Sequence, residues 1–168
     1  MKPLLFVDGY NIIGAWREVA KNGLSLAEAR DKLIHLLADY SGYTAQEIWV
    51  VFDAHLGERP SRSIEQHSGL NIVFTKHGET ADHFIERKCH EMPKYRVARV
   101  ATSDATEQTI ILGRGATRMS ARELLRELTT ERSSGYNKQK NVKTAHSSLG
   151  NVLSDEQYAI LEKLRRSK

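Results

Sequence analysis

Short apolar runs alternate with amphipathic segments along most of this chain. Four runs rich in Val, Ile, Leu and Phe occupy residues 4–7, 48–52, 70–74 and 97–101, and a weaker one occupies residues 115–119. Within each run the apolar residues are nearly continuous, which is typical of strands buried on both faces of a parallel sheet. The pattern therefore predicts a mainly parallel central sheet of about five strands.

The segments between these runs have helical spacing. Residues 25–40 place their leucines on one face, and Ser25 with Glu28 predicts a capping box at the start. Residues 80–92 also have one apolar face and stop before a proline. The same spacing recurs at residues 104–112, 120–131 and 154–166. Strands that alternate with helices indicate an α/β sandwich.

Two long polar stretches interrupt this pattern, at residues 54–69 and 132–151. The second lacks any acidic residue but contains Lys138, Lys140 and Lys143. Loops of this length in a compact domain are usually functional. We expect one domain over residues 1–168, with a basic loop at 132–151 and a C-terminal helix at 154–166, because 168 residues suffice for one buried core.

Composition narrows the class of protein. Hydrophobic residues make up 40% and charged residues 27%, which is ordinary for a globular domain. The single cysteine, Cys89, cannot form an internal disulfide, and no apolar stretch approaches the ~20 residues of a membrane span. We therefore expect a cytoplasmic protein with no membrane partner. The net charge of +4 adds a mild preference for a polyanionic partner.

Acidic residues gather at one end of the predicted sheet. Asp8, Asp53 and Asp104 follow three of the strands, and Asp82 lies in the first turn of a helix. Ligands of parallel sheets bind beyond the carboxyl ends of the strands. Two unit charges ~5 Å apart repel by about 3 kcal/mol at an effective dielectric near 20, so converging acids need a cation. Mg²⁺ or Mn²⁺ suits carboxylate oxygens best.

Each acid also has a local interpretation. Asp8 suits an Asx turn, and Asp104 with Glu107 suits a helix cap. Asp82 would compensate a helix dipole, and Asp53 is ordinary polarity at a strand end. The location of all four at one edge favours a shared site over four independent ones.

Four motifs in this order resemble one known family. "FVDGYNII", "VVFDAH", "GETADHFIE" and "VATSDATEQ" are similar to the YacP-like NYN domains, relatives of PIN-domain nucleases. The resemblance implies a Rossmann-like, PIN-like three-layer sandwich. It also implies a divalent-metal-dependent endoribonuclease that cuts mRNA in association with the translating ribosome.

The resemblance also implies roles for particular residues. Asp8, Asp82 and Asp104 would hold the metal ion, and Asn11 would orient Asp8 or a bound water. A bound ion would lower the pKa of a water molecule and stabilise the charge on phosphorus. Further acids that would join the site are Asp53, Glu86 and Glu107.

Basic and aromatic residues in the two long loops predict contacts with RNA. Tyr136 would stack on a base, and the lysines around it would follow the phosphate backbone. A solvated surface loop is the alternative for both stretches. The candidate RNA-binding residues are Arg59, Arg62, Tyr136, Lys138, Lys140 and Lys143.

Two other functions fit parts of the sequence. A non-catalytic RNA- or ribosome-binding module would keep the fold, but it would gain nothing from acids that face phosphates. A phosphoryl-accepting receiver domain would use Asp53, but it would also need paired acids after the first strand. Neither histidine nor cysteine spacing suits a zinc site. We expect the protein to act as a monomer.

Overall fold

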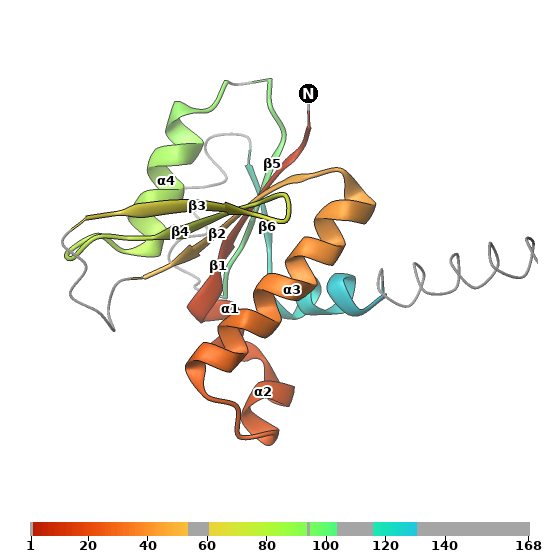
Figure 1. The fold of residues 1–168 in the computed structure, drawn as a ribbon. Coiled ribbons are helices and arrows are strands. Elements are labelled where there is room, and N and C mark those ends of the chain that lie inside the picture. The colour runs from red at the N-terminus through yellow and green to blue at the C-terminus, as the bar shows by residue number, and fades with distance from the viewer. Residues whose placement is uncertain (1, 54–60, 94, 104–115, 131–168) are drawn as a thin grey trace, which may run out of the picture. The chain divides into compact units, whose positions relative to one another are not determined.

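The computed structural model describes residues 2–53, 61–93, 95–103 and 116–130, all within one compact unit, Met1–Arg132. Its centre is a six-stranded sheet of order β3-β4-β2-β1-β5-β6 (Figure 1). The paired strands run parallel except β3, which is antiparallel to β4. The strands are β1 (Leu4–Asp8), β2 (Glu47–Phe52), β3 (Ser63–His67), β4 (Leu70–Phe74), β5 (Ala98–Ala101) and β6 (Ala116–Met119).

Helices cover both faces of this sheet, so the predicted three-layer α/β sandwich is confirmed. Apolar side chains from α1, α3 and the helical residues 121–130 form one core with Leu5 and Val50. Side chains from α4 form the other core with Phe6 and Val51. The helices are α1 (Gly9–Ala15), α2 (Arg17–Lys21), α3 (Leu26–Thr44) and α4 (Ala81–Glu91).

The register aligns the carboxyl ends of the central strands. Asp8, the last residue of β1, pairs with Val51 near the end of β2, and Phe52 pairs with Phe74 at the end of β4. Val7 pairs with Ala101, the last residue of β5. The residues that follow these four strands therefore start from the same edge of the sheet, as the sequence predicts.

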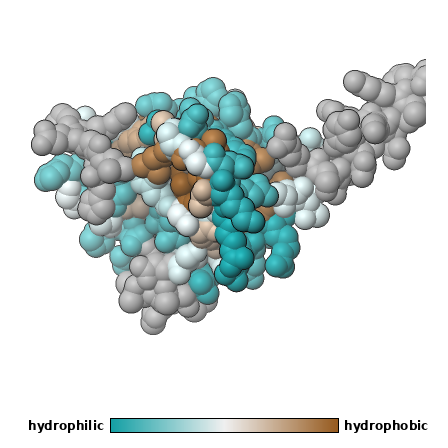
Figure 2. Space-filling view, turned by 90° about the horizontal axis from the view of Figure 1, so that it is seen from below, coloured by the Kyte–Doolittle hydropathy of each residue, from teal (hydrophilic) through white to brown (hydrophobic). Residues whose placement is uncertain are grey.

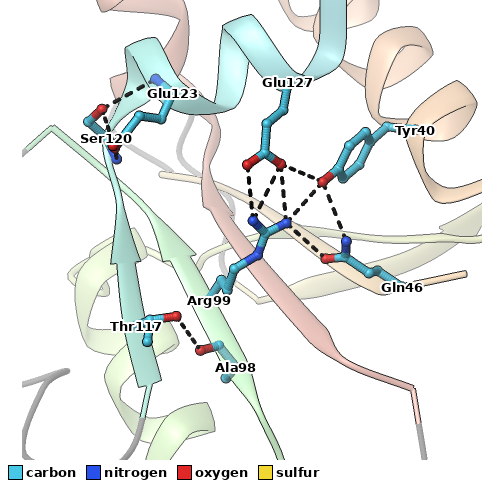
Figure 3. Close-up of polar contacts among 8 residues, drawn as sticks. All are labelled: Tyr40, Gln46, Ala98, Arg99, Thr117, Ser120, Glu123 and Glu127. Atoms are coloured by element: carbon cyan, nitrogen blue, oxygen red, sulfur yellow. Dashed lines mark hydrogen bonds and ion pairs between the residues drawn. The ribbon is translucent and has the colours of Figure 1, made fainter. Parts of the chain in front are cut away.

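Capping residues fix where the helices begin. Ser25 and Glu28 form the predicted capping box at α3. Ser120 and Glu123 make the same reciprocal hydrogen bonds before the helical residues 121–130 (Figure 3). Each box satisfies backbone N–H groups that the first helical turn leaves without partners.

A polar network joins three elements toward the amino ends of the strands (Figure 3). Arg99 on β5 contacts Glu127, with Nη1 3.1 Å from Oε1, and its Nη2 donates to the Tyr40 hydroxyl at 2.9 Å. Tyr40 on α3 in turn donates to Glu127 over 2.6 Å. Arg99 also reaches the Gln46 side-chain oxygen at 3.3 Å. This network ties β5 to two helices at the opposite end of the sheet from Asp8.

The structure differs from the sequence prediction in three elements. Strand β3 lies inside the stretch 54–69 that was predicted to be a loop, which raises the strand number from about five to six. The sequence pattern also missed α1 and α2. The predictions for residues 104–112, 132–151 and 154–166 lie outside the described residues. No helix among the described residues is long and apolar enough to cross a membrane.

Candidate active site

Asp8 joins the first strand to the first helix. It is the last residue of β1 and the N-cap of α1, where its Oδ1 accepts a hydrogen bond from the Asn11 backbone N–H at 3.1 Å. The local interpretation of Asp8 was an Asx turn, and the structure shows instead that Asp8 caps a helix, α1. The cap uses Oδ1, and the side chain is only half-buried.

The surroundings of Asp8 oppose its negative charge. The pKa of this carboxyl is raised from 3.8 to about 6, and burial is the largest cause. The charges of Asp82 and Asp53 and a hydrogen bond with the Asp82 carboxyl contribute to the rise, while the Asn11 N–H opposes it. Like charges and burial both disfavour the ionised form of an acid. Asp8 therefore interacts with two of the other predicted acids, Asp82 and Asp53, at this edge of the sheet.

Two neighbouring elements place the other acids. Asp53 directly follows β2, and Asp82 is the second residue of α4, after the N-cap Thr80. Both side chains are half-buried. Glu86 lies one turn further along α4 and is also half-buried.

Asn11 has a different contact from the one expected. Its side-chain oxygen accepts a hydrogen bond from the Ser103 backbone N–H at 2.6 Å. Only its backbone N–H contacts Asp8. Asn11 thus links the start of α1 to the chain that leaves β5, immediately before Asp104 in the sequence.

The structure describes two of the three predicted metal ligands, Asp8 and Asp82. In the ranges that the structure describes, no three His, Cys, Asp or Glu side chains are grouped closely enough to hold a metal ion. Asp104 and Glu107 lie outside those ranges. The donors that are described fit a hard divalent cation, because Asp8 and Asp82 are interacting carboxyl groups whose repulsion such an ion would relieve.

Arg62, predicted to bind RNA, forms an ion pair with the buried acid Glu79. Its Nε donates to Glu79 Oε2 at 2.9 Å and its Nη2 contacts Oε1, while Arg87 donates to the same Oε1 at 2.7 Å. Both guanidinium groups lie over the Phe84 ring. The two arginines hold the pKa of Glu79 down to about 2 against the effect of burial. The other predicted RNA-binding residues, Arg59, Tyr136, Lys138, Lys140 and Lys143, lie outside the described residues.

The family model of the YacP-like NYN domain matches residues 5–166. The chain belongs to this family. Its fold is accordingly PIN-like, and the resemblance noted in the sequence is confirmed.

Relatives in the family match the chain over nearly its whole length. "Uncharacterized protein YacP" of Bacillus subtilis (strain 168) is 42% identical over 166 residues, which cover 97% of this chain and 96% of that one. The crystal structure of Rae1 (YacP) from Bacillus subtilis aligns with a TM-score of 0.70 at 40% identity, covering 99% of this chain and 96% of that one. A tryptophan-to-leucine variant of Rae1 (YacP) aligns with a TM-score of 0.69 at 41% identity, covering 83% and 82%.

Sequence reasoning missed two residues that lie close in sequence to the candidate acids, Gly9 after Asp8 and Glu79 before Asp82. A Cβ at Gly9 would lie 2.3 Å from the Phe52 ring, so only glycine fits directly after Asp8. Glu79, two residues before the first residue of α4, is buried although it is charged. The "DG" pair signalled the first of these. No local signal marked Glu79, because its partner Arg62 is 17 residues away in the sequence.

Proposed function

We propose that this protein is a divalent-metal-dependent endoribonuclease that hydrolyses phosphodiester bonds of mRNA in association with the translating ribosome. Membership of the NYN-domain family, with its PIN-like fold, supports a nuclease. The observation that favours catalysis is the interaction of the half-buried Asp8 carboxyl with Asp82 at the carboxyl edge of the sheet. The single cysteine favours the cytoplasm as the setting.

In this proposal Asp8, Asp82 and Asp104 hold Mg²⁺ or Mn²⁺. The ion, when bound, supplies an activated water and stabilises negative charge at phosphorus. The carboxylates fix its place at the edge, and Asp53 adds negative charge beside them. Asn11 acts as a positioning residue, because its side chain holds the backbone of Ser103 next to Asp104.

The acid cluster argues against a module that only binds RNA. Carboxylates that face a phosphate backbone weaken binding, and they also destabilise the fold when they repel one another. Proteins keep such unfavourable groups at functional sites, where a ligand or a reaction makes use of them. A catalytic cation would offset both the repulsion among the acids and their repulsion of the phosphate backbone.

The proposal is tested by cleavage of a defined mRNA, with and without translating ribosomes, in Mg²⁺, Mn²⁺ or EDTA. We expect Asp8→Asn, Asp82→Asn and Asp104→Asn each to lower cleavage at least 100-fold, with RNA or ribosome binding nearly unchanged. Asp39→Asn is the matched control, because Asp39 is an exposed acid on α3. Full cleavage in EDTA or by an Asp8→Asn, Asp82→Asn double variant would contradict a metal-dependent nuclease.

A further inference from the structure

A row of aromatic rings ends in a guanidinium group at the carboxyl edge of the sheet. The rings of Tyr10 and Phe52 have centroids 5.2 Å apart. Phe52 stacks on Phe74, with centroids 5.5 Å apart and ring planes inclined by 24°. The Arg30 guanidinium carbon lies 5.7 Å from the centroid of Phe74. The row thus runs from α1 across the ends of β2 and β4 to the first turns of α3.

This row begins beside the acids but lies on the other face of the sheet. Tyr10 is two residues after Asp8, and Phe52 directly precedes Asp53. Side chains alternate along a strand, and Phe52 packs in the core on the α3 side, whereas Val51 packs on the α4 side. By this alternation the side chain of Asp53 is directed toward the α4 side of the sheet, where Asp82 lies. A chain bound across the edge would meet the acids on one side and the rings on the other.

The members of the row differ in exposure in a way that suits a binding surface. Phe52 is fully buried, while Tyr10, Phe74 and Arg30 are each partly exposed. Figure 2 views the end of the molecule where Figure 1 shows α1, α2 and the start of α3, and it shows an apolar patch bordered by hydrophilic side chains. The buried ring anchors a row whose outer members are partly exposed, with the Arg30 guanidinium over the Phe74 ring.

We propose that Tyr10, Phe74 and Arg30 form a stacking platform for a nucleobase of single-stranded RNA. The inference rests on the proposed ribonuclease function and names where the substrate would lie beside the acids. Aromatic faces stack on any base, and a guanidinium group adds stacking and attraction to phosphate. A cation here also offsets the repulsion between the acid cluster and the RNA backbone.

Lys32 offers an internal comparison on the same helix. It also places a cation over an aromatic ring, with Nζ 5.0 Å from the centroid of Trp16. Trp16, however, is buried, with 6% of its surface exposed. Lys32→Gln therefore removes the same charge from α3 as Arg30→Gln without altering the accessible platform.

The experiment measures binding of a short single-stranded RNA to the full chain that carries Asp8→Asn, so that the RNA stays intact. The RNA is prepared unmodified and with one abasic ribose at each position in turn. We expect Phe74→Leu, Tyr10→Leu and Arg30→Gln each to weaken binding about tenfold, since stacking of a base on an aromatic ring is worth about that much or more. Lys32→Gln should bind like the parent.

Coupling between protein and RNA gives the decisive readout. Removal of the base at one position should lower the affinity of the parent for the RNA about tenfold. The same removal should change the affinity of Phe74→Leu or Arg30→Gln little, because these variants already lack the contact. Additive losses at every position, or unchanged binding by all three variants, would overturn the platform. Metal-dependent cleavage by wild-type protein would then still support the ribonuclease. Coupling between the variants and one abasic position, without cleavage by the wild-type protein, would contradict the proposed ribonuclease activity but support the platform.

Discussion

Asp8 shows how a site residue can oppose folding. Its folded pKa of about 6 lies above the usual 3.8, so stability from this group is fully present below about pH 4 and lost as the pH rises through 6. At pH 7 in chelator, Asp8→Asn should therefore raise the free energy of unfolding by about 3 kcal/mol. Asparagine also keeps an oxygen for the cap. Urea unfolding at pH 4 and pH 7 measures the difference.

The pH dependence separates this effect from an ordinary change in packing. The gain from Asp8→Asn should nearly vanish at pH 4, where the wild-type carboxyl is mostly protonated. Asp39→Asn, at an exposed position, should change stability little at either pH. An Asp8→Asn protein less stable than wild type at both pH values would mean that the cap, and not the charge, dominates at this position.

Asn11 was expected from the sequence to orient Asp8 or a bound water, and in the structure its side chain contacts the Ser103 backbone. Loss of its bond to the Ser103 N–H in Asn11→Ala should lower kcat at least tenfold with little change in KM, because the next residue is the proposed ligand Asp104. Amide hydrogen exchange at Ser103 should accelerate in the same variant. Unfolding should become easier by only about 1 kcal/mol, as for one hydrogen bond.

The conservative variant distinguishes positioning from general stability. Asn11→Asp keeps the acceptor oxygen, so the protection of the Ser103 amide should return. An Asn11→Ala protein with normal kcat and fast exchange at Ser103 would show that the contact does not serve the reaction.

At the scale of elements, α1 depends on a close approach between helix and sheet. A Cβ at Gly9 would lie 2.3 Å from Phe52 Cε1, and that ring is fully buried. We expect Gly9→Ala to destabilise the protein by about 1–3 kcal/mol, the usual effect of overpacking. Gly14→Ala in the same helix is the control, because nothing lies within 4 Å of its Cβ position. It should be neutral or stabilise by up to about 1 kcal/mol, measured by urea unfolding.

Glu79 links Arg62, which directly precedes β3, to Arg87 on α4. Its pKa is lowered to about 2, so the stability it provides is present above about pH 4.5 and lost as the pH falls toward 2. Glu79→Gln should lower the free energy of unfolding at pH 7 by about 2–3 kcal/mol, because the acid is 7% exposed and its loss leaves paired cations without a counter-charge. The difference from wild type should shrink steadily below pH 4.

Glu91→Gln provides the matched control for this pair. Glu91 also contacts a lysine and an arginine, but its side chain is 54% exposed. Exposed ion pairs contribute little, so this variant should unfold like wild type at each pH. Equal effects of Glu79→Gln and Glu91→Gln would show that burial of Glu79 does not strengthen its ion pairs.

Comparison of these elements with the sequence pattern shows which of them the sequence predicts and which it does not. Continuous apolar runs located β1, β2, β4 and β5, and a cap signal located the start of α3, because burial and capping act through neighbouring residues. Strand β3 was missed because its residues are mostly polar and exposed at the edge of the sheet. Helix α1 was missed because contact with Phe52 and the cap at Asp8 outweigh its poor helix propensity. The ion pair of Arg62 was also missed, because its partner Glu79 is 17 residues away in the sequence.

At the scale of the whole molecule, basic residues must offset the repulsion between the acidic site and the RNA backbone. The formal charge is +4, and Lys138, Lys140 and Lys143 lie in a stretch without acids. Replacing these three lysines with glutamine lowers the formal charge from +4 to +1. If each contacts one phosphate of single-stranded RNA, the slope of log affinity against log salt should fall in magnitude by about 2. Catalytic turnover of bound RNA should stay close to wild type.

A control with the same net charge decides between local contact and overall attraction. Arg118, Arg122 and Arg126 are exposed on β6 and the helical residues 121–130, and their triple change to glutamine also gives +1. Long-range attraction depends mainly on the total charge, so it would weaken binding equally in both triple variants. Direct contact predicts a reduced salt slope for the lysine variant alone. Equal slopes in the two variants, measured by RNA binding at several salt concentrations, would exclude the basic stretch as the phosphate-binding segment.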